Sequence, residues 1–291
     1  MAAWARASLV PGILAPGAGR HSLRLFMAKR APAEADARGD AKRAASATEG
    51  AIRFSHAPPS YFALEALTPK GRRKNADAGD PRDATRPLVK VGTASVGSWS
   101  CTEGGWVSSE PRATTEVFHV LAGEASVTDS DGEVHRFGQG DTVTLPKGWA
   151  GRWDVAKTFH KVWVVHDHGE VEGASAKAQV APLDHFAPEA MTPQGVRKDA
   201  AYGKPTSTTR KVYSVGTTSV GCWTCTAGGF PVKCRPTTEC FHVLEGLFFL
   251  TNADGSAHRC KAGDTVVLPK GWSGHWDIIE TIKKVWVVVS D

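Results

Sequence analysis

The stretch TEVFHVLAGEASVTDSDGEVHRFGQGDTVTLPKGWAGRWDVAKTFHKVWVV begins at Thr115 and returns from Thr238 as TECFHVLEGLFFLTNADGSAHRCKAGDTVVLPKGWSGHWDIIETIKKVWVV. The two copies are offset by 123 residues without a gap, and 29 of the 50 positions after the first threonine are identical. Further upstream, VGTASVGSWSCTEGG from Val91 pairs with VGTTSVGCWTCTAGG from Val215. Because self-similarity of this length marks a duplicated structural unit, the chain is predicted to contain two copies of one domain.

Each copy consists of short runs rich in β-branched and aromatic residues, separated by turn signals at intervals of about ten residues. Asp131-Gly132 and Asp254-Gly255 predict tight hairpins, because glycine supplies the positive φ that such turns require. A helical period is not sustained within the copies. The pattern therefore predicts an all-β fold for each copy, an antiparallel sandwich or barrel.

The repeat also sets the expected domain boundaries. We place the two units at 58–168 and 181–291, with a polar linker at 169–180. A leader occupies 1–50, and its first 33 residues contain arginines and small residues but no acid. This composition is typical of an organellar transit peptide and favours a mitochondrial location. A plastid location, or a cytoplasmic one if the leader is a simple tail, remains the alternative.

Charge and composition exclude several classes of protein. The net charge is +5, but residues 1–50 carry eight Lys/Arg against four acids, which leaves +1 for the two units. A nearly neutral domain pair lacks the basic stripe that binds phosphate backbones, so nucleic acid is not expected as a partner. No apolar stretch is long enough to span a bilayer. Six cysteines in 291 residues do not predict a disulfide framework.

The order of motifs within each copy resembles a known superfamily. A Glu, a V-L-x-G run, a D-G turn and the run G-D-x-V-x-L-P-x-G together resemble the two conserved motifs of the cupins. The continuation P-K-G-W-x-G-x-W-D and the terminal K-V-W-V-V resemble the subfamily that includes the (S)-ureidoglycine aminohydrolase cupin domain and the ethanolamine-utilisation cupins. The resemblance implies a bicupin with two tandem double-stranded β-helix (RmlC-like, jelly-roll) barrels. It implies much less about activity, because this fold hosts many unrelated chemistries.

The sequence departs from the family at the metal ligands. Metal-binding cupins present an H-x-H pair, a Glu and a later His inside the barrel. Here the Glu is kept as Glu116 and Glu239, but the H-x-H region contains no His and the late His position is glycine in both copies. The remaining candidate ligands are Glu239, His275 and Cys234 in the second copy. A divalent metal is therefore one alternative, although the usual ligand set is absent.

The candidate ligand pocket combines the retained glutamates with aromatic residues. Trp99 and Trp223 precede a Gly-Gly pair on a strand that is expected to line the pocket mouth, with Glu116 and Glu239 inside. These tryptophans either stack on a planar or cationic ligand or pack in the core. Strand alternation places Glu116 and His119 on opposite faces, so His119 is expected at a contact between sheets or subunits.

Two functional hypotheses follow. In the first, the chain is a metal-assisted hydrolase or lyase that acts on a small polar, nitrogenous metabolite, as the resemblance to ureidoglycine aminohydrolase implies, with Glu116 or Glu239 as ligand or general base. In the second, it is a non-catalytic binding or structural subunit of an organellar assembly, with degenerate metal sites.

One strand differs between the copies in a way that indicates a partner surface. Glu124-Ala-Ser-Val in the first copy becomes Leu247-Phe-Phe-Leu in the second. A strand that is apolar on both faces requires cover on its second face. We therefore expect Leu247–Leu250 to contact another unit, in a homodimer or a larger assembly.

Overall fold

The computed structural model describes residues 51–290, so the leader predicted at 1–50 lies outside the described residues. The described residues belong to one compact unit. They form β-strands and four short 3-10 turns, at Pro59–Phe62, Leu64–Ala66, Leu183–Phe186 and Pro188–Ala190. No helix in this part of the chain is long and apolar enough to cross a membrane.

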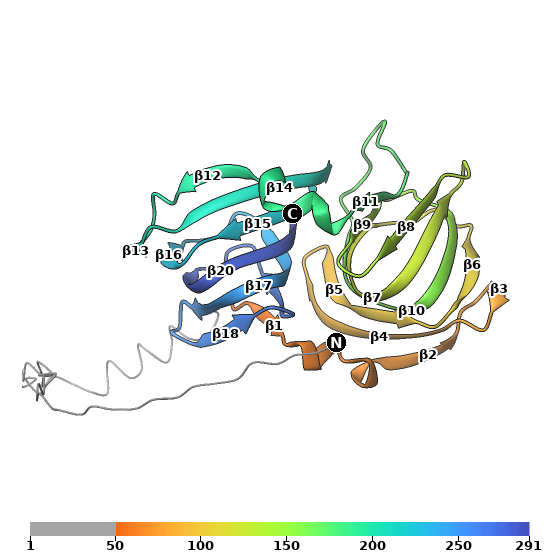
Figure 1. The fold of residues 1–291 in the computed structure, drawn as a ribbon, viewed down its shortest axis with the longest axis horizontal. Helices are drawn as coiled ribbons and strands as arrows, with labels where there is room; N and C mark the ends of the chain where they lie inside the picture. The colour runs from red at the N-terminus through yellow and green to blue at the C-terminus, as the bar shows by residue number, and fades with distance from the viewer. Residues whose placement is uncertain (1–50, 291) are drawn as a thin grey trace, which may run out of the picture. The chain divides into compact units, whose positions relative to one another are not determined.

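The first repeat folds into an antiparallel barrel, here called barrel 1, whose main sheet has the order β11-β9-β7-β10-β5-β4-β2 (Figure 1). Strand β8 adds to β7, while β6 bridges β10 and β3. The strands are β2 (Thr68–Arg72), β3 (Ala76–Gly79), β4 (Arg82–Val91), β5 (Ala94–Cys101), β6 (Gly104–Ser108), β7 (Thr115–Asp129), β8 (Val134–Gly138), β9 (Thr142–Leu145), β10 (Gly151–His166) and β11 (Gln179–Ala181).

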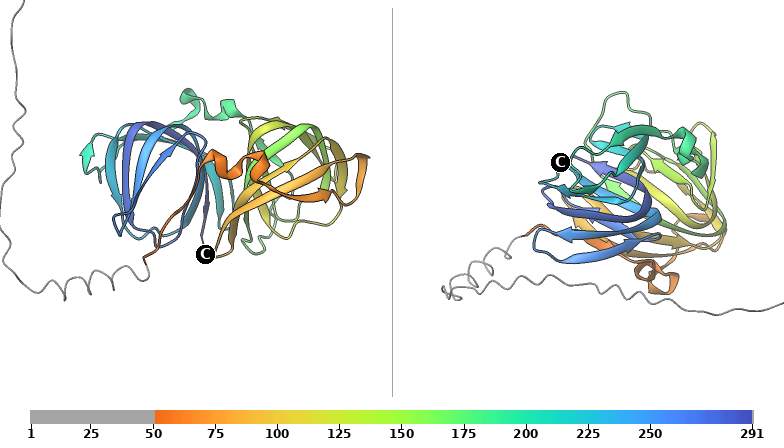
Figure 2. Two further views of the ribbon diagram at one scale, coloured as in Figure 1. Left: turned by 90° about the horizontal axis from the view of Figure 1, so that it is seen from below. Right: turned by 60° about the vertical axis from the view of Figure 1, so that its left-hand side comes forward.

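The second repeat folds in the same way into barrel 2, with the order β1-β19-β17-β20-β15-β14-β12. In the left view of Figure 2, the strands of each barrel curve around an interior. The strands are β1 (Ser55–Ala57), β12 (Thr192–Val196), β13 (Tyr202–Gly203), β14 (Thr206–Val215), β15 (Thr218–Cys225), β16 (Gly228–Val232), β17 (Thr238–Asn252), β18 (Ala257–Lys261), β19 (Thr265–Leu268) and β20 (Gly274–Val289).

Two kinds of glycine shape each barrel. Gly132 and Gly255 have φ of 89° and 83° in the predicted hairpins between β7 and β8 and between β17 and β18. Gly123 and Gly246 interrupt the long strands β7 and β17, with φ of 88° and 93°. A Cβ at either of these two positions would meet a backbone oxygen of the neighbouring strand. Glycine therefore lets each long strand bend, so that its first half pairs with one short strand and its second half with another.

The short strand before each repeat pairs with the opposite barrel. Strand β1, which precedes the first repeat, pairs with β19 of barrel 2, and β11, which precedes the second, pairs with β9 of barrel 1. The boundaries expected from the repeat are therefore corrected at their ends. The linker predicted at 169–180 supplies part of β11 to barrel 1, because the edge strands β9 and β19 have backbone groups that need a partner.

Three apolar clusters explain why the long strands are so strongly buried. Each barrel has its own core, which includes Phe118 and Trp153 in barrel 1 and Phe241 and Trp276 in barrel 2. A third cluster joins the two barrels through the opposite faces of the same strands, and contains Val96, Val117, Val164, Val220, Cys240 and Val287. The first halves of β7 and β17 are thus buried on both faces.

A pair of histidines lies in the contact between the barrels, as strand alternation predicts. The rings of His119 and His242 are 5.2 Å apart, and each Nδ1 lies within hydrogen-bonding distance of a threonine hydroxyl, that of Thr142 or Thr265. Burial lowers the pKa of His119 to about 4. Burial, together with the charges of His119 and His160, lowers the pKa of His242 to about 3.

The strand Leu247–Leu250 divides its side chains between two environments. Phe248 and Leu250 are fully buried in the core of barrel 2. Leu247 and Phe249 are half-buried on the outer face of the barrel. Because Phe248 and Leu250 are covered by the core of their own barrel, they need no second chain to cover them. Phe248 is therefore not available for contact with a partner. The expected partner surface is reduced to Leu247 and Phe249, and assembly through them stays a prediction.

We expect the free energy of unfolding to fall as the pH drops below about 6.5. Between that pH and about 3 the unfolded chain binds more protons than the folded one, because His119 and His242 stay neutral in the contact. Each unit of pKa depression corresponds to about 1.4 kcal/mol. Urea denaturation at several pH values measures the slope. The double variant His119→Gln, His242→Gln should flatten this slope. The control His185→Gln changes a histidine whose side chain is 42% exposed and should leave the slope unchanged. Equal slopes in all three proteins would contradict the assignment.

The variant Phe249→Asp should lower the native mass measured by analytical ultracentrifugation, because a charge is not tolerated in an apolar contact. Ser126→Asp changes the equivalent position of barrel 1 and serves as the matched control. A wild-type protein of monomer mass, or an unchanged mass in Phe249→Asp, would exclude this surface as an interface.

Candidate functional site

Each barrel has a pocket lined by aromatic and charged side chains. In barrel 1 the cavity volume is about 310 Å³, and residues from β4, β5, β7 and β10 contribute to its wall. The lining residues are Lys70, Arg73, Asp83, Thr85, Trp99, Trp106, Ser108, Arg112, Glu116, Trp153, Lys161, Trp163 and Val165. The predicted pocket residues Trp99 and Glu116 therefore lie together in one pocket.

A buried ion-pair network lies at the centre of this pocket. The Nζ of Lys161 is 2.8 Å from Oε1 of Glu116, and a terminal nitrogen of Arg112 is 3.1 Å from Oε2. The lysine is 4% exposed and the glutamate 7%. Both oxygens of the carboxylate are thus engaged by cations.

Aromatic rings surround the lysine on its remaining sides. The Nζ of Lys161 lies 4.0 Å from the ring centre of Phe118, 4.8 Å from that of Trp153 and 4.9 Å from that of Trp99. These distances are within the range in which a cation is attracted to an aromatic face. The lysine therefore exchanges its hydration for one carboxylate and three π-faces.

Barrel 2 repeats this arrangement almost atom for atom. Lys284 lies 2.7 Å from Glu239, and Arg235 lies 3.1 Å from the second oxygen of the same carboxylate. The cavity volume is about 270 Å³. Its lining residues are Arg197, Thr209, Trp223, Phe230, Val232, Arg235, Glu239, Trp276, Lys284, Trp286 and Val288. The predicted pocket residues Trp223 and Glu239 are therefore also brought together.

The charges of the network fix the ionisation of the glutamates. Burial alone would raise the pKa of Glu116, but the charges of Lys161 and Arg112 outweigh it and lower the pKa below its ordinary value. Lys284 and Arg235 lower the pKa of Glu239 for the same reason. Each glutamate is thus an ionised partner of two cations and is poorly placed to act as a general base.

The metal candidates of the second repeat are not brought together. Glu239 is neutralised by its two cations, His275 lies 3.3 Å from Asp277, and Cys234 is exposed. The three do not form a cluster of ligand atoms within the described part of the chain. The structure therefore does not bring Glu239, His275 and Cys234 together, and a metal held by them stays a prediction without support from the geometry. Neither pocket fits a divalent ion, because the central glutamate of each already contacts two cations and the second carboxylate of barrel 1, Asp83, already pairs with Arg73.

The two pockets differ at their rims. In barrel 1, Arg73 lies 2.8 Å from Asp83, which also accepts a hydrogen bond from the indole of Trp99 at 3.1 Å. In barrel 2, Ser207 replaces this aspartate. The equivalent arginine, Arg197, lies 3.7 Å above the ring of Phe230. The centre of the pocket is thus shared, whereas its rim distinguishes the barrels.

Sequence reasoning missed the lysines and arginines of the network. Lys161 and Lys284 belong to the K-V-W-V-V run, and Arg112 and Arg235 precede the glutamates by four residues in both repeats. A signal was present, because each lysine alternates with inward-facing residues, such as Phe159 and Trp163 in β10, and so points into the barrel.

The comparisons with known proteins agree with a tandem of cupin barrels. A protein of unknown function from Pseudomonas syringae pv. tomato str. DC3000, assigned to the DUF861 family, has a TM-score of 0.62 at 17% identity. The match covers 82% of this chain and all of that chain. A putative glyoxylate induced protein from Pseudomonas aeruginosa has a TM-score of 0.58 at 17% identity, over 82% of this chain and 90% of that one. These structures share the bicupin fold.

Family membership follows from the sequence itself. The model of the EutQ-like cupin domain matches residues 89–163 and again residues 214–286, which is about half of the chain. The chain therefore belongs to the EutQ-like cupin domain family, with two copies of the domain. No curated protein matches it.

Replacing Lys161 by methionine should destabilise the protein by about 3–5 kcal/mol, because it removes one partner of a buried ion pair and leaves the other charged. Denaturant unfolding measures the loss. The matched control is Lys157→Met, which removes an exposed lysine on the same strand that pairs with Glu124 and should cost less than about 1 kcal/mol. Similar losses in both variants would contradict the role of the buried pair, and the double variant Lys161→Met, Glu116→Gln should recover part of the stability.

Proposed function

We propose that the protein is a non-catalytic bicupin that binds a small anionic metabolite, of the carboxylate class, in each barrel. The observation that carries this proposal is the charge of the pockets. Four basic side chains and two carboxylates line the pocket of barrel 1, and three basic side chains and one carboxylate line that of barrel 2. Each pocket has a net charge of +2 when the lysines are protonated, and a surplus of fixed cations in a low-dielectric cavity favours an anion.

Unused hydrogen-bond donors support the same ligand class. The Nε of Arg73 in barrel 1 and the Nε of Arg235 in barrel 2 are buried without a hydrogen-bond partner within the described residues. A guanidinium offers planar, paired donors that match a carboxylate. A bound carboxylate beside these arginines would use donors that the protein leaves unsatisfied.

The size and shape of the two cavities restrict the class of ligand further. Cavities of about 270 and 310 Å³ lie just below and at the lower end of the range for small-molecule pockets, roughly 300–1,000 Å³. Tryptophans form much of the wall, including Trp99 and Trp163 in barrel 1 and Trp223 and Trp286 in barrel 2. The ligand is therefore a small, flat metabolite. A nitrogenous metabolite of the kind implied by the cupin resemblance belongs to this class if it bears a carboxylate.

The metal-assisted hydrolase or lyase is the less favoured hypothesis. That chemistry needs a metal or a free general base, and Glu116 and Glu239 are each held by a lysine and an arginine. A binding or accessory role requires neither. A role in an organelle depends on the leader at 1–50, outside the described residues, and stays a prediction.

Isothermal titration with glyoxylate, oxalate and malonate, compared with their neutral amides, tests the proposal. We expect the carboxylates to bind and the amides not to bind. Arg112→Gln and Arg235→Gln should each weaken one site by about 10–100-fold, because a hydrogen bond to a charged group contributes about 1.5–3 kcal/mol.

Matched controls are Arg136→Gln and Arg259→Gln, which change exposed arginines on β8 and β18. These variants should bind as the wild type does. Equal binding of acids and amides, or unchanged affinity in the double variant Arg112→Gln, Arg235→Gln, would overturn the proposal.

A further inference from the structure

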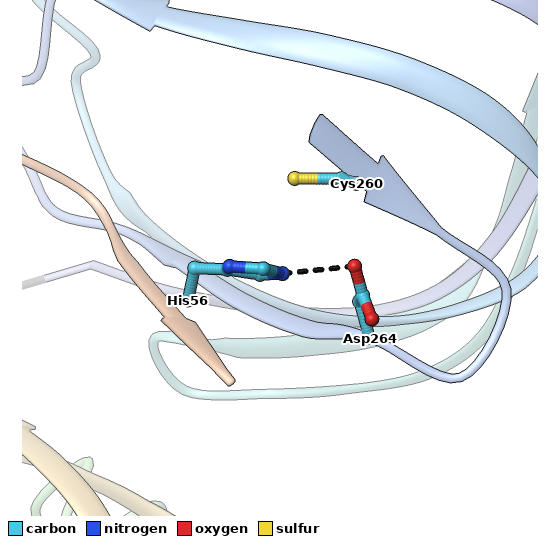
Figure 3. A group of neighbouring side chains, drawn as sticks. All are labelled: His56, Cys260 and Asp264. Carbon is cyan, nitrogen blue, oxygen red and sulfur yellow. Dashed lines mark hydrogen bonds and ion pairs between the residues drawn. The ribbon is translucent and has the colours of Figure 1, made fainter. Parts of the chain in front are cut away.

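Three metal-ligand side chains meet at the edge of barrel 2, away from its pocket (Figure 3). His56 comes from β1, Cys260 from β18 and Asp264 from the turn before β19. Their ligand atoms lie within 4.8 Å of one another, and Nε2 of His56 is 2.8 Å from Oδ2 of Asp264. Cys260 and Asp264 are buried, at 0% and 2% exposure.

The repeat shows that this cluster is peculiar to barrel 2. The position of His56 is Val180 in the equivalent strand β11, and the position of Cys260 is Phe137 in β8. The aspartate is common to both barrels. Two apolar residues around a shared carboxylate are therefore replaced by an imidazole and a thiol, both of which bind transition metals.

A third difference leaves an oxygen of the aspartate without a partner. In barrel 1, Asp141 accepts a hydrogen bond from the backbone N–H of Leu183 through Oδ1. The equivalent residue in barrel 2 is Pro59, which has no N–H to donate. The Oδ1 of Asp264 is accordingly buried with no hydrogen-bond partner among the described residues.

We propose that His56, Cys260 and Asp264 form a binding site for Zn²⁺. Thiolate, imidazole and carboxylate together are a donor set that suits this ion, and three protein ligands leave a fourth position for water. Binding releases the proton of the Cys260 thiol, while His56 keeps its remaining proton on Nδ1. The unpartnered Oδ1 of Asp264 then gains a cation at close range.

A second group of candidate ligand side chains lies in barrel 1, but its members already have hydrogen-bond and ion-pair partners. Asp129, Glu133 and His135 also lie within reach of one another. Asp129, however, accepts hydrogen bonds from Trp149 and Ala178 as well as contacting His135, and Glu133 pairs with Lys177. These side chains already have partners, unlike the oxygen of Asp264.

Zinc binding would strengthen the attachment of β1 to barrel 2. His56 is on the strand that precedes the first repeat, whereas Cys260 and Asp264 belong to the second. Strand β1 pairs with β19 through only three residues. A shared ion would therefore fasten this short strand to barrel 2.

The test uses the full chain with Cys234→Ser, so that the exposed thiol does not capture metal. The protein is treated with a chelator and a reductant and then titrated with Zn²⁺ or Co²⁺. We expect one equivalent of Zn²⁺ by elemental analysis, a thiolate-to-cobalt charge-transfer band with Co²⁺, and slower hydrogen exchange in β1 with Zn²⁺.

His56→Val and Cys260→Ala should each weaken binding by more than about 100-fold, because loss of even an outer partner of a ligand costs 10–100-fold. The control Cys225→Ala removes another buried thiol of barrel 2 and should bind normally. His56→Val introduces the residue found at the equivalent position of barrel 1, Val180. This variant therefore tests zinc binding even if Cys260→Ala does not fold. Absence of stoichiometric binding, or unchanged binding in His56→Val, would overturn the site.

Discussion

The buried ion pair between a lysine and a glutamate is the interaction on which the interior of each barrel depends. Lys161 and Lys284 belong to the last long strand of each barrel, β10 or β20, and line its pocket. Their ammonium groups contact a carboxylate and three aromatic rings. In each barrel the charge of a glutamate is thus balanced by a lysine of the same chain.

The arginine of each ion-pair network gives the pocket its surplus positive charge. An ion pair of one lysine and one glutamate would leave the cavity close to neutral. Arg112 and Arg235 add a charge that no acid at the centre of the pocket balances. The proposed anion specificity rests on this surplus positive charge.

Much of the fold could be predicted from local signals, whereas the site could be predicted only in part. The Asp-Gly turns and the repeat indicate the strands, and Glu116 and Trp99 follow from the motif. The candidate metal ligands are not brought together, because a motif position does not fix the direction of a side chain: Cys234 has a φ of 44° and lies exposed. The zinc candidate could not be predicted, since β1 and β18 are about two hundred residues apart, and β1 reaches barrel 2 through its long-range pairing with β19.

The exchange of β1 and β11 bears on the ancestry of the chain. Each repeat gives its leading strand to the other barrel, so neither repeat covers its own edge. Two polypeptides, each with one repeat and its leading strand, would complete each other by reciprocal exchange of that strand. The present chain has the topology of a domain-swapped dimer whose subunits became fused in tandem. Each half therefore depends on the other for its edge strand, although the two halves differ in their histidines and cysteines.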